Sequence, residues 1–237
     1  MAVAAAEDVK VLSDPLNPFV IRVLIALRLK RVEYELVEVQ LAEPKSEILV
    51  KSNPVYKMVP VLLHREKSIC ESAVIVQYID EEWSDGGGSS SILPADPFDR
   101  AIARSWAAYI DDKLTALIRA LRVETEAEKA TELAGQIRQV LGLLEEAFAE
   151  CGKGKGFFGG DAVGYLDIAL GSCLGWIMAL EKGKSVKLLD AEELPRLAGW
   201  AERFLAEESV KGLVPDADEH LKIDEVAAAR TSATPAA

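Results

Sequence analysis

The feature that most constrains the fold is a change of pattern at residues 85–91, Asp-Gly-Gly-Gly-Ser-Ser-Ser. Before this segment, short apolar or alternating runs predict strands that are interleaved with helical periods. After it, strand signals vanish and apolar residues recur only at helical spacing. A glycine- and serine-rich composition is typical of a flexible linker. The 237 residues therefore predict two small domains, the first mixed α/β and the second all-helical, joined by a linker at residues 85–95.

The first domain is expected at residues 8–84, with the element order βαβ, a short helix, then ββα. The expected strands and helices are, in chain order, 9–13 (strand), 18–30 (helix), 32–39 (strand), 45–51 (helix), 61–64 and 68–70 (strands) and 72–83 (helix). A βαβ unit implies that its two strands are parallel. The second of these strands alternates apolar and acidic residues, which predicts that it is half buried.

The second domain is expected at residues 96–230. Five segments carry helical periodicity: 99–122, 126–151, 165–181, 195–207 and 216–230. Half of all residues are hydrophobic, enough for a substantial core. Residues 231–237 are expected to be a disordered tail.

The composition argues against several classes of function. A formal net charge of −12 argues against nucleic acid or an anionic membrane as the main partner. Two histidines far apart argue against a histidine-based metal site, and no metal is expected. Three widely spaced cysteines fit a reducing compartment better than a disulfide framework. With no basic leader and no apolar run of membrane-spanning length, the expected location is the cytoplasm.

Three short motifs predict a pocket in the first domain. Pro60 opens a strand, where it leaves backbone groups unpaired at the edge. Glu71 and Ser72 open a helix, whose free N–H groups can bind an anion. Asn17 and Pro18 are a preferred N-cap and a preferred first helical residue. Together they indicate a pocket for a ligand that is peptide-like and negatively charged.

The order and spacing of these motifs resemble the cytosolic glutathione transferases, and their details resemble the plant tau class. The resemblance covers about residues 8–228. It rests on Asn17-Pro-Phe-Val-Ile-Arg22, Tyr34-Glu35, Lys45-Ser46, Asn53-Pro-Val, Val59-Pro-Val61, Glu71-Ser72 and Phe157-Phe-Gly-Gly-Asp-Ala-Val-Gly-Tyr-Leu-Asp-Ile-Ala169. It implies a thioredoxin-like first domain that binds glutathione as co-substrate, and a helical domain that carries a hydrophobic substrate pocket.

The same resemblance assigns glutathione contacts. Glu71 and Ser72 match the residues that hold the γ-glutamyl end, although Ser72 could equally be a plain N-cap. Val59 matches the residue that pairs by its main chain with the cysteinyl part, before a cis-proline at Pro60. The alternative for Pro60 is an ordinary trans proline at a strand start. Lys45 matches a contact to the glycine carboxylate, and its alternative is a solvated charge.

Two positions depart from the tau pattern. Asn17 stands where a serine hydroxyl donates to the glutathione sulfur. The asparagine amide can accept from the helix with its oxygen and donate to sulfur with its nitrogen, so we predict a direct role rather than capping alone. Ser13 is disfavoured as a replacement donor. Met58 stands where tau proteins commonly have lysine, and Lys57 on an extended segment would point the opposite way. Weaker glutathione affinity is therefore expected.

By resemblance, residues near the positions that line the substrate pocket are Phe19, Thr115, Arg119, Arg122 and Trp176. Aromatic and apolar residues at helical spacing are more often core, which is the alternative for each. The arginines fit anionic or polyphenolic substrates. Gly164 and Asp167 are interpreted as a helix start in the core, without a catalytic role. Cys70 is expected to be buried and unreactive.

The predicted function is a glutathione S-transferase that joins the glutathione thiolate to hydrophobic electrophiles, acting as a homodimer by resemblance. The alternative is a protein that binds flavonoids or other hydrophobic anions with weak or lost catalysis, which the departures at Asn17 and Met58 favour. Thiol–disulfide exchange and dehydroascorbate reduction are disfavoured because position 17 is not cysteine.

Overall fold

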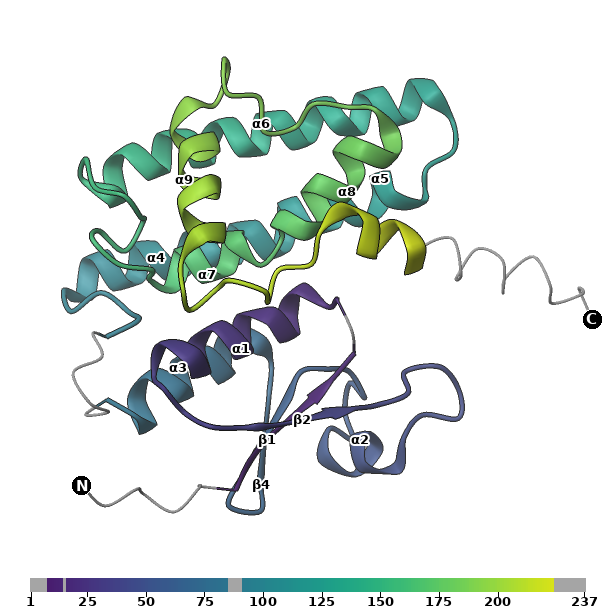
Figure 1. Cartoon of the computed structure of the whole chain (residues 1–237), viewed down its shortest axis with the longest axis vertical. Helices are drawn as coiled ribbons and strands as arrows, with labels where there is room; N and C mark the ends of the chain where they lie inside the picture. Colours follow the sequence, from purple (N-terminus) through teal and green to yellow (C-terminus); the bar gives the residue numbers. More distant parts are fainter. Residues whose placement is uncertain (1–7, 15, 85–90, 224–237) are drawn as a thin grey trace, which may run out of the picture.

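The computed structural model describes residues 8–14, 16–84 and 91–223, and it has a small sheet domain beneath a larger helical one (Figure 1). The first domain contains β1 (Val9–Ser13), α1 (Pro18–Leu29), β2 (Glu35–Glu38), α2 (Glu47–Ser52), β3 (Val61–His64), β4 (Lys67–Cys70) and α3 (Ser72–Glu82). The strand order is β2-β1-β3-β4, with β1 parallel to β2 and antiparallel to β3. The βαβ–α–ββα order and the parallel first pair are as the sequence predicts.

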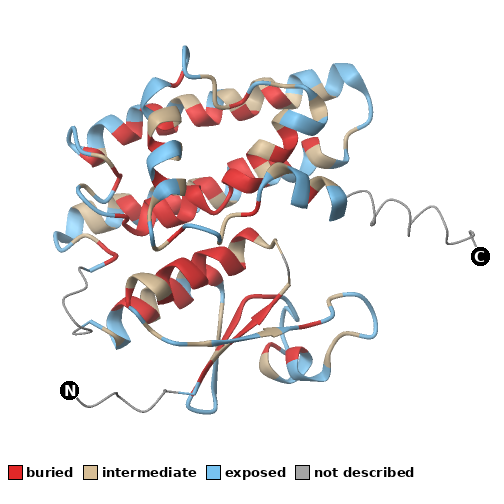
Figure 2. Cartoon of the chain, in the orientation of Figure 1, coloured by how far each residue is buried: buried red, intermediate tan, exposed pale blue. Residues whose placement is uncertain are grey.

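Helix α1 lies between the sheet and the helical domain, and both cover it (Figures 1 and 2). Of the apolar residues that recur at helical spacing in this segment, Val20, Val23, Leu24 and Leu27 are buried, and Phe19 is partly buried. Ile21 and Ile25, which fall outside this spacing, are buried as well. Residues 20–27 are all buried, Arg22 among them, so α1 is covered on all sides and forms the centre of the molecule.

The prediction that the second strand is half buried is confirmed in part, because Val37 is partly buried against the core and Val39 is buried, whereas Leu36 is exposed. β2 spans only Glu35–Glu38, and Leu36 is 46% exposed. β2 is an edge strand that pairs with β1 alone, so its side chains lie at the margin of the sheet. Alternation along a strand is only a signal that one face can be buried, and the edge position decides whether it is.

The second domain contains α4 (Pro97–Tyr109), a π-helical turn η1 (Ile110–Leu114), α5 (Thr115–Val123), α6 (Ala127–Gly152), α7 (Tyr165–Gly171), α8 (Leu174–Lys184) and α9 (Pro195–Ala206). Residues 217–223 are also helical. Two predicted helices are interrupted in the structure. The segment 99–122 contains the π turn, and the segment 165–181 is divided between α7 and α8. At the end of α7, Phe204 of α9 packs so close to Gly171 that a Cβ there would clash with its ring.

Asp80 in α3 connects the two domains. Its carboxylate accepts hydrogen bonds from the backbone N–H groups of Ile92 (2.8 Å) and Leu93 (2.9 Å) and from the hydroxyl of Ser91 (2.9 Å). The buried ammonium of Lys30, at the end of α1, lies 2.7 Å from it. The last part of the predicted linker is therefore held in place. Residues 85–90 and the predicted tail 231–237 lie outside the described residues, as do 224–230.

Arg22 joins α1 to the helical domain. Its buried guanidinium forms two bonds to Asp111 in η1, of 2.7 and 3.0 Å. It also donates to the hydroxyl of Ser172 and to the carbonyl of Ala169. A guanidinium with this many hydrogen-bond partners is fixed in its orientation as well as in its distance from them. The π turn at η1 and the start of α1 are thus fixed relative to each other.

Asp167 has the structural role that the sequence indicates. Its carboxylate accepts from the backbone N–H groups of Phe158, Gly159 and Gly164 and from the indole of Trp200. Burial raises the pKa of Asp167 to about 6, although these bonds act in the opposite direction. A carboxylate with four internal donors closes the loop before α7 and organises the core of the helical domain.

Candidate functional site

A cavity of about 360 Å³ lies where the two domains meet. Its lining residues are Phe19, Asn53, Tyr56, Met58, Val59, Pro60, Glu71, Ser72 and Arg119. Most of the predicted glutathione residues are therefore brought together with two of the predicted substrate-pocket residues. Asn17 and Lys45 do not line the cavity themselves, but each is bonded to the main chain of a residue at or beside it.

The Val59–Pro60 peptide bond is cis, which confirms that prediction. Val59 is buried and precedes the first ladder residue of β3, Val61. In the described part of the chain, the backbone N–H and C=O of Val59 make no hydrogen bond to protein. Buried backbone groups normally have partners. This segment can therefore pair with a ligand main chain, in the manner of an added strand.

Ser72 is the first helical residue of α3, and the N-cap position belongs to Glu71. The alternative that Ser72 is a plain N-cap is thus wrong, since α3 has no side-chain cap hydrogen bond. Glu71 has φ 70°, a left-handed conformation that is uncommon for a non-glycine residue. Strained backbone conformations of this kind are frequent at binding sites. Here the conformation of Glu71 leaves the first N–H groups of α3 and the Ser72 hydroxyl available to bind an anion beside the cavity.

Asn17 caps α1, as predicted. Its side-chain oxygen accepts from the backbone N–H of Phe19 at 2.9 Å, and Pro18 is the first helical residue. The amide nitrogen remains as the donor, and Phe19 itself lines the cavity. By contrast, Ser13 is buried at the end of β1.

Asn53 lines the cavity, although the sequence pattern indicates it only as part of a motif. Its side-chain nitrogen donates to the carbonyl of Met58 (3.0 Å), and its oxygen accepts from the N–H of Tyr56 (3.2 Å). Asn53 therefore shapes the loop that precedes the cis-proline. The signal in the sequence was an asparagine followed by proline, which favours a turn.

Lys45 reaches the same loop, and its ammonium donates to the carbonyl of Lys57 at 3.1 Å. Lys57 has φ 52°, so our premise of an extended chain at this residue is wrong. Met58, which is 49% exposed, lines the cavity, and Lys57 is not among the lining residues. At Met58 the edge of the cavity is thus apolar, whereas the tau pattern has a charged lysine at this position.

The predicted substrate pocket is only partly as expected. Phe19 and Trp176 form an edge-to-face pair at 6.5 Å, with Arg119 against both rings and Arg122 against Trp176. Thr115 does not belong to this group. Its side chain is buried, and its hydroxyl donates to the carbonyl of Asp111 at 2.6 Å within the helix.

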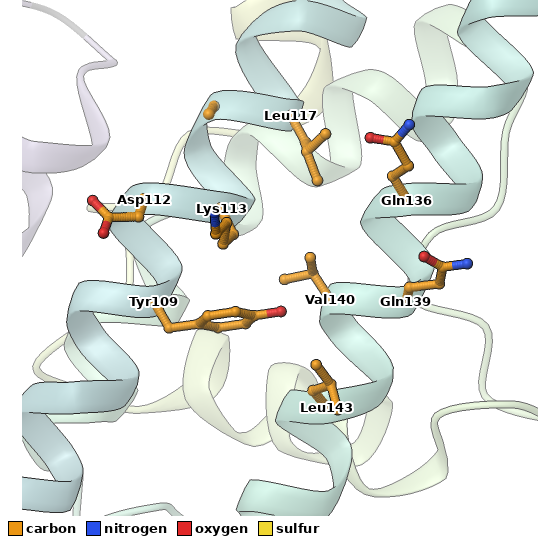
Figure 3. Close-up of a pocket in the computed structure, with 9 residues that line it drawn as sticks. Tyr109, Asp112, Lys113, Leu117, Gln136, Gln139, Val140 and Leu143 are labelled. Carbon is orange, nitrogen blue, oxygen red and sulfur yellow. The ribbon is translucent and has the colours of Figure 1, made fainter.

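The larger hollow of the molecule, about 620 Å³, contains none of these residues. It lies between α4, η1 and α5 on one side and α6 on the other (Figure 3). Its walls include Tyr109, Lys113, Leu117, Gln136 and Val140. Size alone does not identify the site, because the smaller cavity has the unpaired backbone and the helix start.

The cysteines offer no reactive thiolate. Cys70 is half-buried rather than fully buried, and burial raises the pKa of its thiol, with the charge of Glu71 adding to the effect. No group of His, Cys, Asp and Glu that could hold a metal ion is found among the described residues. In the same residues, no helix is long and apolar enough to cross a membrane.

Comparison with known proteins gives matches to both domains. Residues 7–81 match the family model "Glutathione S-transferase, N-terminal domain", and residues 100–203 match "Glutathione S-transferase, C-terminal domain". A probable glutathione S-transferase GSTU6 of Oryza sativa subsp. japonica is 49% identical over 90% of this chain and 91% of its own length. Glutathione S-transferase U18 of Arabidopsis thaliana is 47% identical over 90% and 92%.

Solved structures agree with these matches. The tau-class glutathione S-transferase of mango, Mangifera indica, has a TM-score of 0.88 at 45% identity and covers 94% of this chain and 99% of its own. Rice GST1, solved in complex with glutathione, has a TM-score of 0.84 at 30% identity with the same coverage. The sheet domain with its cis-proline pocket and the helical domain above it thus agree with the family in sequence and in fold. The chain belongs to the glutathione S-transferase family, and within it to the plant tau class.

Proposed function

We propose that this protein is a glutathione S-transferase that joins the thiolate of reduced glutathione to hydrophobic electrophiles. The observation that carries the proposal is the cavity in which the unpaired backbone of Val59 and the start of α3 meet Phe19 and Arg119. One part of this cavity suits a charged peptide, and the other suits an aromatic or apolar acceptor. The glutathione complex of the rice relative supports the assignment of the first part.

In this proposal, each part of glutathione has a partner. The Val59 main chain pairs with the cysteinyl residue, Glu71 pairs with the γ-glutamyl ammonium, and Ser72 with the first N–H groups of α3 binds the γ-glutamyl carboxylate. The ammonium of Lys45 donates one hydrogen bond to the Lys57 carbonyl, and its other N–H groups bind the glycine carboxylate in this proposal. The tripeptide then lies with its sulfur toward the start of α1.

The chemical step is a nucleophilic attack. The positive end of α1 and the amide nitrogen of Asn17 stabilise the thiolate. The sulfur forms a bond to the electrophilic carbon, and the leaving group departs with the electron pair of its broken bond. In an enone, sulfur bonds to the β-carbon, the electron pair of the carbon–carbon double bond moves to form an enolate, and the α-carbon then accepts a proton. The protein contributes orientation and stabilisation of the sulfur anion, so no metal is needed for this step.

The substitution Met58→Lys is expected to tighten glutathione binding by about tenfold, the range of one charge-assisted hydrogen bond. Titration calorimetry with reduced glutathione measures the dissociation constant. The matched control is Lys57→Met, which removes a charge one residue away and is expected to change the constant much less. Equal constants for the wild type and Met58→Lys would show that the apolar edge of the cavity does not limit affinity.

The function itself is tested by turnover of a chromogenic aryl halide with glutathione, beside titration with an anilinonaphthalene sulfonate dye. If the protein is a transferase, its rate should saturate with the concentration of each substrate. The variant Ser72→Ala should then have a higher KM for glutathione. Dye binding without turnover would instead support the binding protein for flavonoids and other hydrophobic anions.

We also propose that the protein acts in the cytoplasm as a homodimer. Dimeric assembly is typical of the family, and the three cysteines are free thiols. Sedimentation velocity measures the assembly state, and a monomer at micromolar concentration would contradict it.

A further inference from the structure

Arg119 lines the cavity and lies against two aromatic rings. Its guanidinium carbon lies 5.3 Å from the centroid of the Phe19 ring and 5.9 Å from that of Trp176. Both distances are within the range of cation–π attraction. Among the described residues, no hydrogen bond joins the Arg119 guanidinium to another protein group, so its planar set of N–H donors can bind another partner.

The two neighbouring arginines, Arg22 and Arg122, have other contacts. Arg22 lies 4.9 Å from the Phe19 ring, but Asp111 neutralises it through two hydrogen bonds. Arg122 lies against Trp176 and does not line the cavity. Among the described residues, no carboxylate lies within ion-pair distance of Arg119. The cavity therefore contains a cation whose charge is not balanced by an internal acid.

The placement of this cation relative to the reacting sulfur follows from α1. Asn17 and Phe19 are joined by a hydrogen bond at the helix start, and Arg119 lies against the Phe19 ring. The proposed thiolate site and the guanidinium are thus separated by about one aromatic side chain. The overall charge of −12 would repel an anionic substrate, so its capture requires a local cation of this kind.

We infer that the preferred acceptors of this enzyme carry an anionic group, such as a carboxylate, about one ring's breadth from the electrophilic carbon. Arg119 binds this group through its planar fork, and the rings of Phe19 and Trp176 hold the guanidinium and the apolar body of the acceptor. This inference rests on the proposed transferase function and names the acceptor class for the same cavity.

The test compares two electrophiles that differ in one group: a chloronitrobenzoate and the matching neutral chloronitrobenzamide. In both, the thiolate sulfur forms the new carbon–sulfur bond, and chloride leaves with the electron pair of the broken carbon–chlorine bond. The readout is the ratio of kcat/KM for the carboxylate to that for the amide, corrected for the uncatalysed rates. The ratio cancels differences in protein folding and glutathione binding between variants.

Arg119→Gln is expected to lower this ratio by about tenfold or more, the range of a charge-assisted hydrogen bond, and Arg119→Lys is expected to lower it less. The matched control is Lys113→Gln, which removes the same charge from the adjacent η1 turn without touching the cavity. Its ratio should equal that of the wild type. An unchanged ratio in Arg119→Gln, or an equal fall in Lys113→Gln, would overturn the inference.

A separate measurement distinguishes failure of this inference from failure of the transferase proposal. Calorimetric binding of the two S-aryl glutathione conjugates requires no turnover. A carboxylate preference that disappears in Arg119→Gln supports the anion site even if neither electrophile is turned over, in which case the transferase proposal alone fails. Equal binding of both conjugates to the wild type contradicts the anion site.

Discussion

Replacing Asp80 with alanine is expected to lower the free energy of unfolding by about 3–5 kcal/mol, the range for breaking a buried ion pair. The side chain of Lys30 is 0% exposed and would lose this carboxylate, while the N–H groups of Ile92 and Leu93 would lose their acceptor. Urea denaturation followed by circular dichroism measures the loss. Because Asp80 joins α1, α3 and the segment entering the helical domain, a less cooperative transition is also expected.

The control is Glu35→Ala, which breaks an ion pair of similar length on the surface. Lys10 and Glu35 lie 2.9 Å apart, but both side chains are well exposed. Such pairs contribute about 0–1 kcal/mol. Equal losses in Asp80→Ala and Glu35→Ala would contradict the role of burial.

The same carboxylate has a defined pH dependence. Burial alone would raise the pKa of Asp80, but Lys30 and the N–H groups of Ile92 and Leu93 outweigh it and hold the pKa below its usual value. A lowered folded-state pKa adds stability that is present above the unfolded-state pKa of about 4 and is lost as the pH falls through the folded value. The difference in unfolding free energy between wild type and Asp80→Asn should therefore shrink below about pH 4.

Replacing Asn17 with alanine is expected to lower kcat/KM for aryl halides by about a hundredfold, the low end for loss of one donor to a reacting anion. The pKa of the thiol of bound glutathione should rise, because the sulfur loses an N–H donor near the helix start. The pH profile of kcat/KM and the ultraviolet absorbance of the thiolate both measure this pKa. The lost cap costs about 1 kcal/mol of stability, which denaturation measures separately.

Two further variants separate capping from donation. Asn17→Asp keeps an acceptor for the Phe19 N–H, at 2.9 Å in the wild type, but has no donor for sulfur. It should lose activity without losing the cap. Asn17→Ser keeps both a cap and a donor, so it should remain close to the wild type or exceed it. An unchanged thiol pKa in Asn17→Ala would leave Asn17 with a structural role only.

Much of the fold follows from local signals in the sequence. The Asn17-Pro18 start, the Val59-Pro60 step and the loss of strand signals after residues 85–91 each act over a few residues. Capping, proline geometry and apolar periodicity are local physics, so the element order and the two-part organisation could be predicted. The identity of the pocket also depended on the order of the motifs, which the resemblance supplied.

Two interpretations failed where the residue pattern does not specify the backbone conformation or the partner of a side chain. Thr115 fits the helical period of a pocket residue, yet its hydroxyl bonds within the helix and its side chain is buried. Ser72 looks like an N-cap, but the left-handed Glu71 moves it into the helix. Sequence pattern specifies which faces can be buried or bonded, and it does not specify what covers them.

The sequence by itself determined the strands and helices, the capped start of α1 and the two positions that depart from the tau pattern. Only the tertiary structure decided that α1 is buried on all sides, that Asn53 shapes the cis-proline loop, and that Arg119 lies against two aromatic rings. The reason is the range of the forces involved. Propensity and capping act between neighbours, whereas burial and charge pairing join residues as far apart as Arg22 and Ser172.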